Sequence, residues 1–97
     1  LVLPFCPEAM ITRCLENRVF AITANRVGTE ERINGERLKF IGKSESVTPS
    51  GKILYRASGN KEEIGIVDIN PKEARNKKIT QLNDIFKDRR EKLYKLL

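Results

Sequence analysis

The fold is decided by residues 7–24, PEAMITRCLENRVFAITA, where one periodicity gives way to another. In the first part, apolar side chains recur at helical spacing and form a single stripe, made of Met10, Ile11, Cys14 and Leu15. Proline and a carboxylate near the start of this part are typical of a first helical turn. The stretch therefore predicts a helix over residues 7–17, followed by a buried strand over residues 19–24 that is rich in β-branched and aromatic residues.

The next part of the chain predicts a hairpin. Residues 29–37 are polar and contain the turn signal Asn34-Gly35, which favours a surface excursion between strands. A strand is expected over residues 41–48, and Pro49-Ser50-Gly51 then predicts a tight reversal. Its hairpin partner is expected over residues 52–57.

The last strand is expected over residues 63–69, where Ile64, Ile66 and Val67 are dense. Asn70 can cap the short helical turn that Pro71 begins, over residues 71–76. The remaining tail, residues 77–97, has no clean period, but its many apolar residues suggest that it packs against something.

Four strands and one main helix, with an extended C-terminal tail, define an α/β protein, or α+β by layers. The strands predicted over residues 19–24 and 63–69 look apolar on both faces. One helix can cover only one face of a sheet, so a second covering layer is missing.

Length and composition limit the chain to one small domain, residues 1–97. It has 39% hydrophobic and 33% charged residues, the balance of a soluble globular protein rather than a disordered tail. No apolar stretch approaches the length of a membrane span, and no signal peptide is visible, so we expect no membrane partner. The chain starts at Leu1 without an initiator methionine, which suggests a processed product or a piece of something longer.

The absence of histidine excludes a Ser-His-Asp or Cys-His site within the chain and any His-ligated zinc. Cys6 and Cys14 are the only cysteines, and the predicted helix separates them by about 12 Å, too far for a disulfide. Reduced thiols predict a cytoplasmic protein. Cys14 lies on the apolar stripe, where a small buried hydrophobe is the common role, whereas Cys6 stands near a helix start, where a thiol pKa is lowered. No metal site and no cofactor are expected.

The net charge of +6 is concentrated in the tail. Residues 1–70 carry 10 basic against 9 acidic residues, and residues 71–97 carry 9 against 4. A basic tail can bind nucleic acid or an acidic protein surface. Interleaved acidic residues favour a solvated face with local ion pairs, so we do not expect nucleic acid as a partner. A basic binding module, or a dimerisation module without catalysis, nevertheless remains an alternative.

The order of several short motifs along the chain indicates a known protein family. Leu1-Val-Leu-Pro-Phe5, Ala9-Met10, Leu15-Glu-Asn-Arg-Val-Phe20 and Ile22-Thr-Ala-Asn-Arg-Val-Gly28 occur in this order. They are followed by Phe40-Ile-Gly-Lys-Ser44 with Pro49-Ser-Gly51, then Glu63-Ile-Gly-Ile-Val67, then Asn83-Asp-Ile-Phe-Lys-Asp-Arg-Arg90. The series resembles the segment after the nucleophile in the nitrilase, or carbon–nitrogen hydrolase, superfamily. The resemblance extends over essentially the whole chain.

The resemblance implies that this chain is the C-terminal portion of a hydrolase of small nitriles or amides. The family's catalytic groups are a glutamate, a lysine and a cysteine, and all three would precede Leu1. No catalytic residue is therefore expected in the chain, and by itself it should be inactive. The family fold is a four-layer αββα sandwich, in which the missing N-terminal portion would cover the second apolar face.

The resemblance also implies which residues meet a substrate or a partner. Substrate-pocket rim residues would be Val2, Leu3, Pro4 and Phe5, which directly follow the nucleophile's strand and loop. The family forms dimers through a helix like residues 7–17 and through an extended tail. The interface residues would then be Met10, Cys14, Ile85, Phe86, Leu93 and Tyr94, in a homo-oligomer whose rim carries the basic charge.

Overall fold

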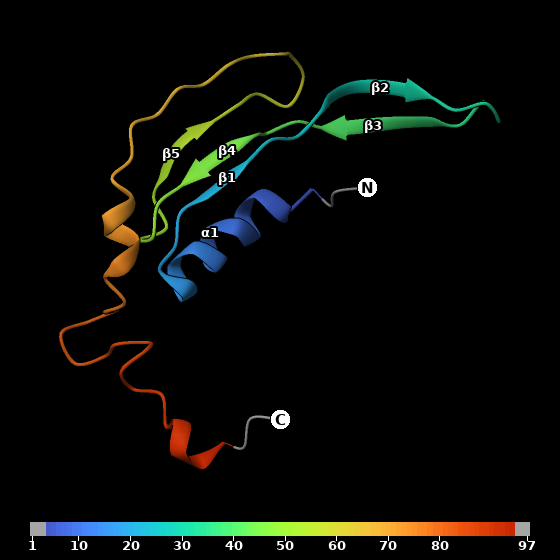
Figure 1. Ribbon diagram of the computed structural model, residues 1–97. Coiled ribbons are helices and arrows are strands. Elements are labelled where there is room, and N and C mark those ends of the chain that lie inside the picture. Colours follow the sequence, from blue (N-terminus) through green and yellow to red (C-terminus); the bar gives the residue numbers. More distant parts are fainter. Residues whose placement is uncertain (1–3, 95–97) are drawn as a thin grey trace.

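The computed structural model describes residues 4–94 and shows a mixed α/β architecture (Figure 1). The helices are α1, Cys6–Asn17, and two 3-10 helices, η1, Pro71–Arg75, and η2, Glu91–Leu93. The strands are β1, Ala21–Thr23; β2, Val27–Glu31; β3, Arg37–Ile41; β4, Glu45–Val47; and β5, Ile53–Arg56. Strands β1, β4 and β5 form one antiparallel sheet in the order β1-β4-β5, and β2 pairs with β3 in a separate two-stranded sheet.

Helix α1 confirms the predicted helix, with its start one residue earlier. It ends at Arg18, which adopts a left-handed conformation with φ 53° and donates its backbone N–H to the Cys14 carbonyl. Helix α1 packs on β4 of the three-stranded sheet, and Cys14 is the residue of the apolar stripe that this packing buries completely. Ile11 and Leu15 lie against the turn after β4, because the backbone of Gly51 approaches both side chains.

The core is small and centres on β4, the middle strand of the three-stranded sheet. Cys14 of α1 and Val47 of β4 have no exposed surface, and Glu45 and Ser46 are 4% and 5% exposed. Every residue of β4 is therefore buried, although two of its three side chains are polar. Position in the middle of the sheet and beneath the helix determines this burial, rather than hydrophobicity.

Strand β1 pairs with β4 and β2 pairs with β3, and the two pairs follow one another as one long antiparallel ribbon. Ala21 lies opposite Val47 in the first sheet, and Val27 lies opposite Ile41 in the second. The register is unchanged because three residues, 24–26, interrupt one side and three residues, 42–44, interrupt the other. We define the body of the molecule as α1 and the three-stranded sheet. The interruption ends this sheet and lets the β2–β3 hairpin extend beyond the body (Figure 1).

Residues 29–37 are not the unpaired excursion that the sequence predicts. Residues 29–31 pair with residues 37–39, and only residues 32–36 form the turn, with Gly35 at φ 80°. The Asn34-Gly35 signal was correct, but the flanking strands are charged and mostly exposed. Residues 29–31 of β2 lack the apolar alternation by which a half-buried strand is recognised, although Leu38 and Phe40 of β3 show it.

The second hairpin confirms the predicted reversal at Pro49-Ser50-Gly51. The Gly51 amide donates to the Thr48 carbonyl at 2.9 Å, and Gly51 has φ 79°. Strand β5 forms within the predicted range 52–57. The preceding strand is shorter than predicted, because the range 41–48 contains the end of β3, the interruption and β4.

The strand predicted over residues 63–69 is wrong: these residues have no regular secondary structure. Ile64 and Ile66 are 90% and 89% exposed, whereas the backbone of Gly65 lies against the ring of Tyr55. Within residues 4–94 no neighbouring strand pairs with this segment.

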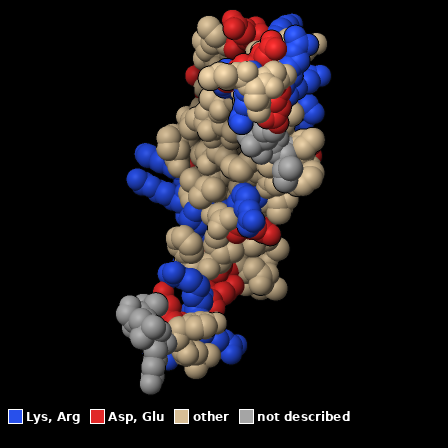
Figure 2. All heavy atoms as spheres, turned by 90° about the vertical axis from the view of Figure 1, so that its right-hand side faces the viewer, with Lys and Arg blue, Asp and Glu red and all other residues tan. Residues whose placement is uncertain are grey.

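After this segment, η1 confirms the predicted helical turn, and Asn70 caps it by accepting the Lys72 amide at 3.1 Å. The chain then continues away from the body as the arm, which we define as residues 77–90 (Figure 1). In Figure 2 the hairpin end and the arm end carry charges of both signs, and uncharged side chains dominate the surface between them. No helix in the described range is long and apolar enough to cross a membrane.

Candidate functional site: the ribbon interruption and its two cavities

The interruption of the ribbon is held by side chains together with one backbone hydrogen bond, from the Gly42 amide to the Arg26 carbonyl at 2.8 Å. Asn25 donates its backbone N–H to the Ser44 hydroxyl at 2.8 Å and its side-chain amide to the Gly42 carbonyl at 2.9 Å. The Ser44 hydroxyl also lies 3.3 Å from the Asn25 carbonyl, to which it donates. These contacts satisfy backbone groups that would otherwise lack a partner where the ladder stops.

Two consecutive left-handed residues make the bend opposite Asn25. Gly42 has φ 62°, and a Cβ there would lie 2.6 Å from Val27 Cγ1 and 2.7 Å from the Ser58 carbonyl oxygen, so only glycine fits. Lys43 follows with φ 56°, a conformation that costs a non-glycine residue free energy. Its amide donates to the Ser58 carbonyl at 3.1 Å, which fixes the lysine backbone in this conformation.

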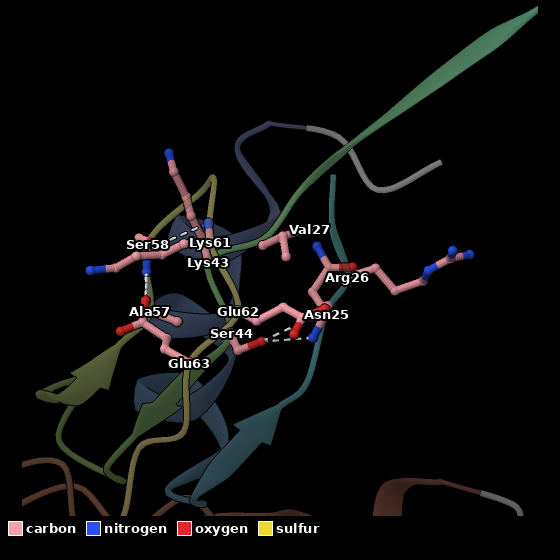
Figure 3. Close-up of a pocket in the computed structure, with 10 residues that line it drawn as sticks. All are labelled: Asn25, Arg26, Val27, Lys43, Ser44, Ala57, Ser58, Lys61, Glu62 and Glu63. Atoms are coloured by element: carbon pink, nitrogen blue, oxygen red, sulfur yellow. Dashed lines mark hydrogen bonds between the residues drawn. The ribbon is translucent and has the colours of Figure 1, made fainter. Parts of the chain in front are cut away.

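A cavity of about 360 Å³ lies beside this bend. It is lined by Asn25, Arg26, Val27, Lys43, Ser44, Ala57, Ser58, Lys61, Glu62 and Glu63 (Figure 3). Figure 3 shows the Arg26 side chain extending away from the other labelled residues. Its guanidinium pairs with Glu30 at 2.9 Å and lies 4.2 Å from the centre of the Phe40 ring. The formal charges that remain at the cavity, from two lysines and two glutamates, balance.

Glu63 closes one side of this cavity. Its carboxylate accepts the Tyr55 hydroxyl at 2.8 Å and the Ser58 amide. Donation by the Ser58 amide, and then by the Tyr55 hydroxyl, holds the pKa of Glu63 below its ordinary value. The same hydrogen bond raises the pKa of Tyr55. Ionised Glu63 thus ties the loop after β5 to the strand itself.

The smaller cavity, of about 100 Å³, lies between the start of α1 and the interruption. Cys6, Pro7 and Met10 line it from α1, and Asn25 and Lys43 belong to both cavities. Glu45 also lines the small cavity, and its side chain is 2% exposed.

An ionic network joins α1 to the sheet at this point. Arg56 of β5 donates to Glu45 Oε2 through Nε at 2.9 Å and Nη2 at 2.7 Å, and to Glu8 Oε1 through Nη1 at 2.9 Å. The hydrogen bond with Glu45 is the main cause that raises the pKa of Arg56. Glu45 Oε1 is buried without a partner among the described residues. The network therefore compensates one oxygen of a buried carboxylate and leaves the other uncompensated.

The two thiols differ in environment. Both cysteines are free, as predicted: Cys14 is buried and Cys6 is half-buried at the small cavity. Burial, and then the charge of Glu45, raises the pKa of Cys14, which lowers its fraction of reactive thiolate. This matches the interpretation of Cys14 as a small buried hydrophobe.

The predicted pocket-rim residues lie partly within the described range. Pro4 is exposed and Phe5 is 63% exposed. They immediately precede Cys6 and Pro7, which line the small cavity. Val2 and Leu3 lie outside the described residues.

The predicted interface residues differ in their exposure to solvent. Met10 and Ile85 are half-buried, and Phe86, Leu93 and Tyr94 are 52%, 73% and 71% exposed. Cys14 is enclosed within its own chain, so it offers no surface to a partner and the prediction for this residue needs correction. Cys14 sits on the inward side of the stripe, which sequence spacing does not distinguish from the outward side.

Sequence reasoning did not find Asn25 and Lys43 as the residues that join the two cavities. Both occur within the motifs quoted above, Ile22–Gly28 and Phe40–Ser44, which was a usable signal. Their role depends on the register of the ribbon, which those motifs do not contain.

Comparison with known proteins identifies the class. The family model for carbon-nitrogen hydrolases matches residues 7–79, so the chain belongs to the carbon–nitrogen hydrolase family. The chain is also similar to a protein named nitrilase from Pyrococcus abyssi, with 50% identity over 94 residues. That alignment covers 97% of this chain and 34% of the relative, so the chain spans about a third of the relative's length.

Proposed function

We propose that this chain is the C-terminal part of a carbon–nitrogen hydrolase that acts on a small nitrile or amide. The observation that carries the proposal is the 50% identity to a protein named nitrilase over nearly the whole chain, which spans a third of that protein. The glutamate, lysine and cysteine of the active site are then supplied by polypeptide that precedes Leu1. No cofactor or metal takes part.

In this mechanism the thiolate of that cysteine attacks the nitrile or amide carbon. An amide loses ammonia as the thioester forms, whereas a nitrile forms a thioimidate that one water converts to the thioester with loss of ammonia. A further water then hydrolyses the thioester to the carboxylic acid and frees the thiol. The contribution of this chain is to shape the pocket. Pro4 and Phe5, together with Val2 and Leu3, form the rim. Phe5 supports this role because it is 63% exposed at the start of α1, next to the small cavity.

The complete domain would be a four-layer αββα sandwich. Support comes from the face of the chain that α1 does not cover: Ile64 and Ile66 are almost fully exposed, and Ile22 of β1 is 73% exposed. Exposed isoleucines on two extended segments of one chain are typical of a surface that packs against another layer. We propose that the N-terminal portion of the same domain covers this face.

We further propose a cytoplasmic homo-oligomer that uses α1 and the tail as interface. Two free cysteines support a reducing compartment. The large exposed side chains of Phe86, Leu93 and Tyr94 support an interface role, because interface anchors are enriched in aromatic residues.

The test is complementation. Ammonia release from a panel of small nitriles and amides is measured for the purified chain, and again after co-expression with the N-terminal portion. We expect no turnover by the chain alone and turnover by the reconstituted enzyme. A Cys6→Ser/Cys14→Ala variant of the chain should reconstitute activity, since the nucleophile lies elsewhere. Turnover by the chain alone, or complete loss with this variant, would contradict the proposal.

The alternative is a basic binding or dimerisation module without catalysis, and its support is the charge of the tail, with 9 basic and 4 acidic residues. Against it, the arm's Arg89 is already engaged by Glu91 at 2.9 Å and by the ring of Phe86. Affinity for nucleic acid that falls steeply with salt would favour this alternative.

A further inference from the structure

The arm, residues 77–90, has a local structure of its own. Lys78 and Asp84 form an isolated β-bridge, and the Ile85 amide donates to the Lys77 carbonyl at 3.0 Å. Asp84 Oδ1 accepts the amides of Phe86 and Lys87 at 3.0 and 2.9 Å, and these bonds, that of Lys87 first, hold the pKa of Asp84 below its ordinary value. The arm therefore has a defined shape, although it lies away from the core.

One side chain connects this arm to the body. Lys77 Nζ donates to the carbonyl of Asn17 at 3.1 Å and to the carbonyl of Arg18 at 2.9 Å. Within residues 4–94, no other side-chain hydrogen bond or ion pair joins the arm to residues 4–70. Among these polar contacts, the connection thus depends on a single ammonium group.

The site of attachment favours a cation. Asn17 is the last residue of α1 and Arg18 is its cap, so both carbonyls belong to the negative end of the helix dipole. The last turn of α1 has no basic residue of its own. Lys77 supplies that charge from a position about sixty residues further along the chain.

The same ammonium also contacts the arm. Lys77 Nζ lies 5.1 Å from the centre of the Phe86 ring, and the Arg89 guanidinium lies 4.9 Å from it. The two cations therefore hold an aromatic ring that is 52% exposed. Lys77 contacts the helix end and the arm at once, which fixes their relative position.

We propose that Lys77 is a positioning residue, a latch that fixes the arm against the C-terminal end of α1. Loss of its charge would free the arm to move about Asn76, which lies between η1 and the arm, while the hydrogen bonds within the arm persist. In the part that rests on the proposed function, the latch holds two interface elements, α1 and Phe86, in one geometry before a second copy of the chain binds.

The test uses the complete polypeptide and cleavage by chymotrypsin after Phe86, which requires the arm to open. Lys77→Met keeps the aliphatic stem and removes the charge, and we expect cleavage to accelerate about tenfold. Lys78→Met is the matched control: it removes the same charge from the next residue, whose side chain makes no hydrogen bond within the described range. Its cleavage rate should remain close to wild type.

Two further readouts keep the test decisive. Cleavage after Tyr55, in β5 of the three-stranded sheet, reports unfolding of the body and should not change. Lys77→Arg retains a cation and should restore most of the protection. Equal acceleration by both methionine variants, no acceleration by either, or no rescue by arginine would each overturn the latch. The oligomeric state is measured by sedimentation in the same samples, so that failure of the proposed oligomer is seen separately.

Discussion

Strand β4 and residues 62–70 lie in environments opposite to those that their compositions suggest, because the polar strand is buried and the apolar segment is exposed. The three residues of β4 are Glu45, Ser46 and Val47, and all are buried. The other segment contains Ile64 and Ile66, and both are almost fully exposed. Burial in this chain therefore follows position: β4 has a strand on each side and contacts α1. In the described range no strand pairs with residues 62–70, which lie against Tyr55 of β5.

The largest effect is expected where the exposed segment is changed. In the complete polypeptide the proposed covering layer buries both isoleucines, so Ile64→Ala/Ile66→Ala should lower the free energy of unfolding by about 4–8 kcal/mol, measured by urea denaturation. In the isolated chain the same double variant should change stability by less than about 0.5 kcal/mol, because exposed side chains contribute little. Equal effects in the two contexts would remove the proposed layer.

The next effect concerns the buried carboxylate of β4. Arg56→Met leaves Glu45 without its partner, and we expect a loss of about 3–5 kcal/mol in the free energy of unfolding. The control is Arg13→Met, since Arg13 pairs with Glu16 on the surface at 3.8 Å and such pairs contribute about 0–1 kcal/mol. Similar values for the two variants would mean that the Arg56 network does not stabilise the body.

A smaller effect is expected where the two regions meet. The backbone of Gly65 lies against the Tyr55 ring, and an added Cβ would require the ring to move. Gly65→Ala should therefore destabilise the protein by about 1–3 kcal/mol. Gly28 has open space around it, but its φ of 92° makes it a poor control, so Ala57→Gly in the neighbouring loop is the better comparison. A neutral Gly65→Ala would show that the segment is not held against β5.

The smallest effect is expected on the pKa of Glu63. Removing the hydroxyl with Tyr55→Phe should raise the pKa of Glu63, measured by NMR, yet leave it below the ordinary value because the Ser58 amide still donates. Since the folded-state pKa is lowered, the contact is present near neutral pH and is lost as pH falls below about 4. Asp84 serves as the internal control, and its pKa should not change.

The sequence was sufficient where local chemistry determines structure. The apolar stripe, Pro49-Ser50-Gly51 and the Asn70 cap gave α1, the second hairpin and η1. The sequence did not predict structure that depends on pairing between separate segments. Residues 29–31 pair although they are polar, and residues 63–69 remain unpaired although they are apolar. The same limit applies to the candidate site, because Lys43 reaches both cavities only through the ribbon register. Cys14 shows a finer limit, since its side of the stripe depends on how α1 sits on β4.

We propose that residues 62–70 form an internal packing surface of a larger hydrolase domain, and amide hydrogen exchange measures whether that surface is covered. Exchange is compared, peptide by peptide, between the isolated chain and the complete polypeptide, with the β4 peptide as reference. Residues 62–70 should change from fast exchange in the isolated chain to strong protection in the complete polypeptide, while β4 changes little. Equally fast exchange of residues 62–70 in both would contradict it.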